Sequence, residues 1–155
     1  RLAAEEAERT CKGNEGIFCG AAIELPDGTV ITGKNSPLMH AASSVIMNAA
    51  KKLADLPDKL HLLSPNIIDS VGYLKQGIMR SRMLSLDLEE TLIALSISAT
   101  ANQAAMLGME TLKELRGCEM RMTHIPTPGD EAGLRRLGIN LTTDPNFAGK
   151  NLFVS

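Results

Sequence analysis

Two histidines and one aspartate occur where polar loops lead into predicted helices. His40 follows the polar stretch Lys34-Asn35-Ser36, and His124 lies six residues before Asp130. An imidazole titrates near neutral pH and serves as a general acid or base, and a carboxylate can orient it. His40, His124 and Asp130 are therefore the candidate catalytic residues. Each also fits a structural role, because lone histidines are commonly surface residues and Asp130 suits the first turn of a capped helix.

Lys34, Asn35 and Ser36 supply donors in front of a helix that we predict from Pro37 to Asp55. The free N–H groups and the dipole at a helix N-terminus favour an anion. Ser36 could instead simply cap that helix. The stretch thus fits either the site of a small anionic or nucleotide-like ligand or a purely structural helix start.

Thr123 and Thr127 belong to a second polar entrance of the same kind. Thr123-His124 ends a predicted strand, and Thr127 precedes a predicted helix. Ligands of α/β sheets bind beyond the carboxyl ends of strands, where loops enter helices. We expect Thr123 and Thr127 to contribute to ligand binding, with both entrances in one cleft. The sequence does not distinguish a catalytic site from a binding site.

The segment Gly28–Lys34 matches most of the phosphate-loop pattern G-x-x-x-x-G-K. The next residue is Asn35, where a Ser or Thr would bind Mg²⁺, and the four intervening residues are Thr-Val-Ile-Thr. Those residues favour a strand rather than a loop that wraps phosphates. A phosphate loop is therefore not expected.

The cysteines Cys11, Cys19 and Cys118 share no C-x-x-C spacing, and the sequence lacks an H-E-x-x-H motif. No metal site is expected, and no motif identifies a cofactor. An odd number of thiols without a disulfide framework is typical of a cytoplasmic protein. The net charge of −2 includes no basic stripe, so we expect no nucleic-acid partner.

Thr91–Met109 is an uncharged run of 19 residues, about the length of a membrane span. It contains serines, threonines, an asparagine and a glutamine, so a helix buried in protein fits better than a membrane helix. With eight methionines in the chain, this segment also suggests a subunit contact. We therefore expect a homo-oligomer, and an interaction or oligomerisation module without catalysis is the alternative function.

Strands and helices alternate along the chain after an N-terminal hairpin, which predicts an α/β domain with a mixed sheet and helices on both faces. The expected strands are 17–25, 29–32, 60–63, 118–125, 139–142 and 152–154, and the expected helices are 1–10, 37–55, 64–77, 87–115 (with a possible break near 102) and 127–138.

Three long motifs, GIFCGAAIELPDG, TGKNSPLMHAASS and THIPTPGDEAGLRRLGINLTTDPNF, resemble the C-terminal part of a bacterial family catalogued as domain of unknown function 1846. The resemblance implies a three-layer α/β/α arrangement, with a fold similar to that of cytidine deaminases, and no established activity. Deaminases carry H-x-E on one helix and P-C-x-x-C on the next. Here the first motif reads His40-Ala41-Ala42 and the cysteine pair is absent, so the zinc chemistry is not implied.

The chain begins at Arg1 in a charged stretch of helical composition. We expect residues 1–155 to form a single domain at the C-terminus of a longer protein. Residues 1–15 would be a helix tail and loop, and the remaining N-terminal part would be a partner.

Overall fold

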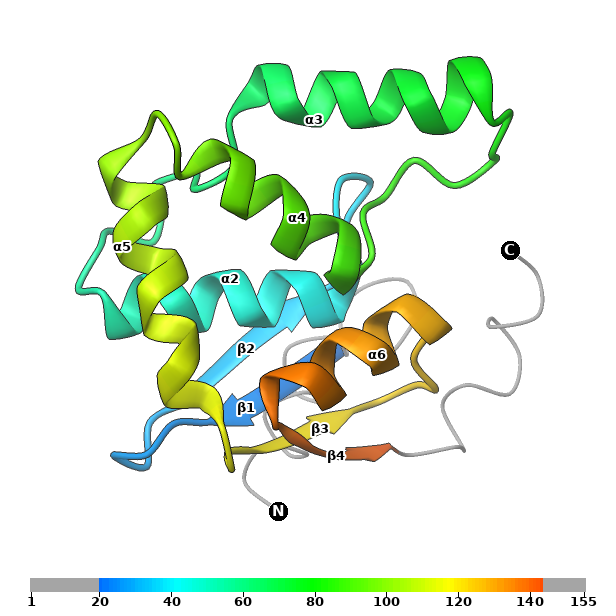
Figure 1. The fold of residues 1–155 in the computed structure, drawn as a ribbon. Coiled ribbons are helices and arrows are strands. Elements are labelled where there is room, and N and C mark those ends of the chain that lie inside the picture. Colours follow the sequence, from blue (N-terminus) through cyan, green and yellow to red (C-terminus); the bar gives the residue numbers. More distant parts are fainter. Residues whose placement is uncertain (1–19, 144–155) are drawn as a thin grey trace.

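The computed structural model describes residues 20–143 and has an α/β fold built on a four-stranded sheet (Figure 1). The strands lie in the order β2-β1-β3-β4. Strand β1 is antiparallel to both of its neighbours, and β3 is parallel to β4. The predicted mixed sheet and hairpin are therefore confirmed. The strands are β1 (Gly20–Glu24), β2 (Val30–Lys34), β3 (Glu119–Met122) and β4 (Asn140–Thr143).

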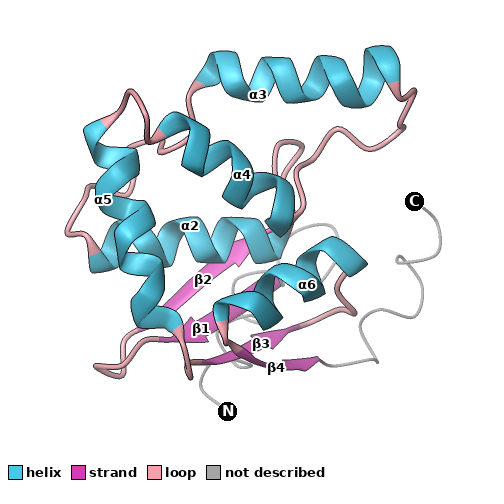
Figure 2. Ribbon diagram, in the orientation of Figure 1, coloured by secondary structure: helices cyan, strands magenta, loops and turns pink. Residues whose placement is uncertain are grey.

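The helices of the described residues lie on one side of this sheet (Figure 2). Helices α2 and α6 lie nearest the strands, α4 and α5 pack over them, and α3 is outermost. The α-helices are α2 (Ala41–Leu53), α3 (Pro65–Gly72), α4 (Leu88–Ser98), α5 (Gln103–Thr111) and α6 (Pro128–Leu137); a π-helical segment, η1 (Tyr73–Ile78), continues α3, and a 3₁₀ segment, η2 (Leu112–Leu115), follows α5.

The core lies between the sheet and these helices. Ala21 and Ile23 of β1 belong to the main buried cluster, together with Val45 and Ile46 of α2. Ala22 points to the opposite face of the sheet and is outside that cluster, as strand alternation requires. The described helices cover only the face of the sheet that carries Ala21 and Ile23. The expectation of helices on both faces of the sheet therefore stays a prediction. No helix within residues 20–143 has the length and apolarity needed to cross a membrane.

Gly33 allows β2 and α2 to approach each other closely. A Cβ atom at this position would collide with the backbone nitrogen of Val45 and lie 2.9 Å from the carbonyl carbon of Ser44. The glycine of the near-match to a phosphate loop is thus required for packing. Lys34 follows it as the last residue of the strand.

Three helix boundaries that local capping signals predict are confirmed. Asp87 and Glu90 form a reciprocal capping box at the start of α4. Asn102 caps α5 through its side chain and divides the predicted helix 87–115. Gly138 ends α6 in the left-handed conformation, with φ of 79°.

One predicted element is wrong, and two others are partly right. The segment 60–63 is irregular rather than a strand, although Leu62 and Leu63 are buried. The helix predicted from Pro37 begins at Ala41. The segment 87–115 is not buried all round, because Ile93 and Ile97 of α4 are 62% and 45% exposed. The predicted helix 1–10 and strand 152–154 lie outside the described residues.

Candidate functional site

The beginnings of three helices meet at Asp130, in the first turn of α6. The side chain of Asp130 is only 1% exposed. Its Oδ1 accepts a hydrogen bond from the backbone N–H of Leu88, the first residue of α4, at 2.8 Å. Its Oδ2 lies 2.9 Å from Nδ1 of His40, the residue at the N-cap of α2. The fold thus joins two predicted catalytic residues that are 90 positions apart in the sequence.

The charges of His40 and Asp130 stabilise each other. The hydrogen bond to Asp130 raises the pKa of His40 above its usual 6.5, against the effect of burial. Burial alone would raise the pKa of Asp130, but the hydrogen bond and charge of His40, with the N–H of Leu88, lower it below 3.8. The pair is therefore an imidazolium and a carboxylate at mildly acidic pH.

His124 lies close enough to this pair to be affected by both charges. Burial lowers the pKa of His124, the carboxylate of Asp130 raises it, and the charge of His40 lowers it. The Nδ1 atom of His124 is buried and has no hydrogen-bond partner within residues 20–143. Among the described residues, Nδ1 of His124 is thus a buried ring nitrogen with unused hydrogen-bonding capacity beside the pair of His40 and Asp130.

We expect NMR titration to separate the two histidines of this cluster. The ring protons of His40 should titrate above pH 6.5 and those of His124 below it, because a carboxylate supports the first and burial dominates the second. In the Asp130→Asn variant the pKa of His40 should fall. A wild-type His40 that titrates below His124 would contradict the ion pair.

Thr123 and Thr127 make structural hydrogen bonds near the cluster. The hydroxyl of Thr127 accepts a bond of 3.3 Å from the backbone N–H of Asp130 and caps α6. The hydroxyl of Thr123 accepts from the N–H of Gly20 at 2.9 Å and lies 3.2 Å from its carbonyl oxygen, which joins β3 to β1. Both predicted ligand-binding threonines therefore have a role in the fold itself.

The residues before α2 are arranged differently from the prediction. Asn35, rather than Ser36, satisfies the helix start, because its Oδ1 accepts a hydrogen bond from the N–H of Ala41 at 2.6 Å. The hydroxyl of Ser36 instead accepts from the N–H of Met39 at 3.0 Å in a turn. The helix cannot begin earlier because the backbone N–H of His40 pairs with the carbonyl oxygen of Leu86, a distant segment.

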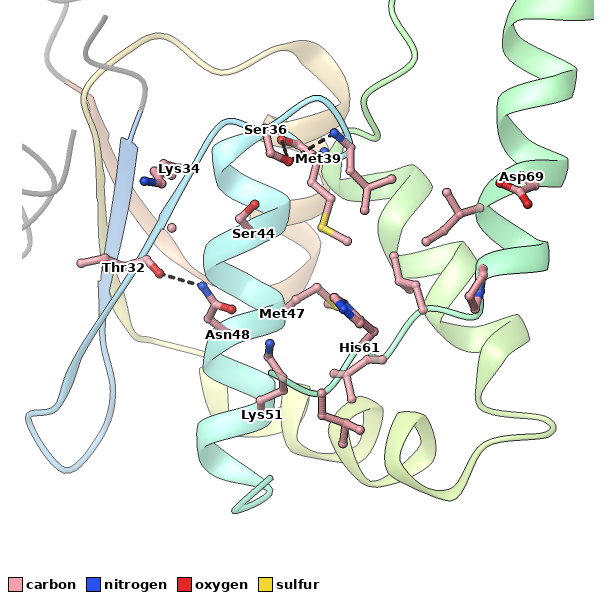
Figure 3. Close-up of a pocket in the computed structure, with 17 residues that line it drawn as sticks. Thr32, Lys34, Ser36, Met39, Ser44, Met47, Asn48, Lys51, His61 and Asp69 are labelled. Atoms are coloured by element: carbon pink, nitrogen blue, oxygen red, sulfur yellow. Dashed lines mark hydrogen bonds between the residues drawn. The ribbon is translucent and has the colours of Figure 1, made fainter. Parts of the chain in front are cut away.

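A pocket of about 640 Å³ lies along one side of α2 (Figure 3). Ser44, Asn48 and Lys51 line it from one stripe of the helix, and His61 lines it from the segment before α3, beside Met47. The remaining lining residues are Thr32, Gly33, Lys34, Ser36, Leu38, Met39, Met47, Leu60, Leu62, Leu63, Pro65, Ile68 and Asp69. The pocket thus combines a few polar groups with a largely aliphatic wall.

The predicted site residues fall into two groups. Lys34 and Ser36 line the pocket, whereas His40, His124 and Asp130 do not. The two groups lie in separate places, one along α2 and one at the junction of α2, α4 and α6.

Sequence reasoning missed Ser44, Asn48, Lys51 and His61 as pocket residues. The first three were detectable as the polar stripe of the predicted helix, because residues four and three positions apart share a helix face. His61 offered no such signal, since it lies in an irregular segment next to buried leucines.

The two lysines that line the pocket differ, because one is exposed and the ammonium of the other already donates a hydrogen bond to the protein. The Lys51 side chain is buried, its Nζ donates to the carbonyl oxygen of Asp58 at 2.6 Å, and burial lowers the pKa of Lys51. Lys34 is exposed at the end of β2. Asn48 donates to the carbonyl oxygen of Thr32 at 2.9 Å, which leaves its side-chain oxygen for other partners. Within residues 20–143, no three His, Cys, Asp or Glu side chains are grouped to hold a metal ion.

The chain belongs to a protein family described as "Domain of unknown function DUF1846, C-terminal", whose family model matches residues 1–153. The resemblance stated from the three sequence motifs is thereby confirmed.

Curated relatives of the chain carry the name UPF0371 protein. One from Clostridioides difficile strain 630 is 44% identical over 134 residues, which cover 86% of this chain and 27% of that protein. One from Fusobacterium nucleatum is 44% identical over 132 residues, which cover 85% of this chain and 26% of that protein. The chain therefore spans about a quarter of the length of these relatives.

Proposed function

We propose that this domain binds a small anionic molecule in the pocket along α2. The observation that carries the proposal is a cavity of about 640 Å³ with an exposed lysine at one edge and aliphatic side chains along its wall. Small-molecule sites are typically apolar concavities of this size with a few polar groups that orient the ligand. The proposed ligand carries a phosphate or carboxylate group and an apolar or ring portion, as a nucleotide-like metabolite does.

Each side of the pocket would contribute a different interaction. The ammonium of Lys34 and the hydroxyls of Ser36 and Ser44 would bind the anionic group by charge-assisted hydrogen bonds. Met39 and Met47 offer flexible apolar surface that adapts to a ring or an alkyl chain. Lys51 would contribute its charge while its ammonium stays bound to the carbonyl oxygen of Asp58.

Thermal-shift measurements with nucleoside monophosphates, phosphorylated sugars and inorganic phosphate test this proposal. A bound ligand at 100 times its Kd should stabilise the protein by about 2.7 kcal/mol. We expect Lys34→Ala to need about ten times more ligand for the same thermal shift. Ser44→Leu, which fills the cavity, should abolish the shift. Lys59→Ala removes the same charge outside the pocket and serves as the control. Equal shifts in Lys34→Ala, Ser44→Leu and wild type would refute the proposed site.

The catalytic role predicted for His40, His124 and Asp130 stays a prediction. With Nδ1 of His40 bound to Asp130, its Nε2 is the atom that could exchange a proton with a ligand. The same hydrogen bonds equally support a structural role, because both oxygens of Asp130 are engaged by the protein.

The finer fold assignment, a three-layer arrangement similar to the cytidine-deaminase-like fold, is also a proposal. It is supported by the positions of His40 and of Pro128-Gly129-Asp130 at the beginnings of two helices that lie against the sheet, as the H-x-E and P-C-x-x-C motifs of deaminases also lie on helices, although α3, α4 and α5 come between the two helices here. In this protein a hydrogen bond between His40 and Asp130 joins the two helix starts.

The alternative function is an interaction module without catalysis. Exposed apolar side chains on the segment Thr91–Met109 favour it, since Ile93 is 62% exposed and Leu107 is 44% exposed.

A further inference from the structure

The end of the α3–η1 helix and the loop after it expose an unusual concentration of large apolar side chains. Six of the twelve exposed large hydrophobic residues in the part of the chain that the structure describes fall between positions 73 and 84. We call these six residues the distal face: Tyr73 (68% exposed), Leu74 (47%), Ile78 (60%), Met79 (65%), Met83 (45%) and Leu84 (43%). Concentrated apolar exposure of this kind marks an interaction surface.

The helix that carries the distal face is held at a defined position by partly buried polar contacts. Lys75 is 8% exposed, and its Nζ donates to Oε1 of Glu90 at 2.8 Å and to the carbonyl oxygen of Ser85 at 2.9 Å. At the other end of α3, the N–H of Ser64 donates to the hydroxyl of Ser98 at 2.9 Å. The apolar side chains are therefore presented on an anchored helix.

A groove of about 440 Å³ runs between this helix and the body of the domain. Tyr73 and Gly77 line one wall, and Leu38, Leu84 and Leu86 line the other. A groove with apolar walls beside exposed aliphatic side chains suits an apolar polypeptide segment. Arg80 and Arg82 are exposed between Met79 and Met83 of the distal face, so the complementary segment would carry acidic residues beside its apolar ones.

The length of the relatives indicates which polypeptide can occupy this surface. The matched region makes up 26–27% of those proteins, and the family description places it at the C-terminus. We propose that, in the full-length protein, the distal face and its groove bind an apolar, acid-flanked segment of the polypeptide that precedes this domain. This intramolecular contact would fix the domain against the rest of the protein, independently of any ligand in the pocket along α2.

Site-specific cross-linking in full-length protein tests this inference. A benzophenone amino acid in place of Tyr73 keeps an aromatic group on the distal face, and the same substitution at Lys113, which is 78% exposed on η2, is the control. We expect mass spectrometry to identify cross-links from position 73 to peptides that precede this domain in the same molecule, and at least tenfold fewer from position 113. Cross-links between two copies would assign the surface to self-association and overturn the inference. The absence of any cross-link from position 73 would overturn it as well.

A second variant separates docking from misfolding. Ile78→Glu places a charge on the distal face without entering the core, because Ile78 is 60% exposed. We expect this variant to lose the cross-link at position 73 and to show at least tenfold faster amide exchange over residues 73–84, with core helix α2 still protected. Unchanged exchange in the Ile78→Glu variant would show that no segment covers this surface.

Discussion

Replacement of Asp130 by asparagine is expected to destabilise the protein by about 1–3 kcal/mol, the usual cost of removing one partner of a buried hydrogen bond. Asparagine can still accept the hydrogen bond from the N–H of Leu88, but it leaves the imidazolium of His40 without a counter-charge. Because Asp130 is 1% exposed, water cannot replace the missing carboxylate. Urea denaturation at pH 6 measures the loss directly.

Glu131→Gln is the matched control for Asp130→Asn. Glu131 is the next residue in α6, is 62% exposed, and lies 3.6 Å from Arg135. An exposed ion pair contributes little, so this variant should stay within about 0.5 kcal/mol of the wild type. If Asp130→Asn were as mild as the control, Asp130 would not be the junction of the three helices.

The same variant should change how stability depends on pH. The raised pKa of His40 contributes stability that is complete below about pH 6.5 and is lost as the pH rises through the folded pKa. The lowered pKa of Asp130 contributes stability that is present above about pH 3.8 and is lost as the pH falls through its folded pKa. The difference in unfolding free energy between wild type and Asp130→Asn should therefore be largest between these two pH values and should shrink on either side.

Gly33→Ala is expected to cost about 3 kcal/mol, the upper part of the range for overpacking a tight interior. The added methyl group would meet the backbone of α2 at Val45, with the Cα of Val45 at 2.8 Å. A backbone cannot rotate away as a flexible side chain can, so β2 and α2 would have to separate. The chemical denaturation midpoint and the thermal unfolding temperature should both fall.

Gly72→Ala is the matched control for Gly33→Ala. Gly72 has α-helical backbone angles at the end of α3, and a Cβ atom there would have no neighbour within 4 Å. Alanine favours a helix more than glycine does, so this variant should gain about 0.5–1 kcal/mol. If both alanine substitutions stabilised the protein, the contact between Gly33 and α2 would not be close.

The pocket shows which features of the site can be predicted from the sequence. Helical spacing alone puts Ser44, Asn48 and Lys51 on one face of the helix, so this polar stripe can be predicted. The pocket itself was not visible, since its opposite wall comes from β2 and from the irregular segment around His61.

Features that depend only on neighbouring residues were predictable from the sequence: the capping box of Asp87 and Glu90, the Asn102 break and the Gly138 terminus. Each is set by hydrogen bonds between backbone and side-chain groups that are only a few positions apart in the sequence. The pairing of His40 with Asp130 depended on tertiary structure, because 90 residues separate them and only the convergence of α2, α4 and α6 brings them together. The start of α2 was decided in the same way, since the bridge between Met39 and Leu86 and the bond from the N–H of His40 to Leu86 kept these residues out of the helix and overrode the local Ser-Pro signal.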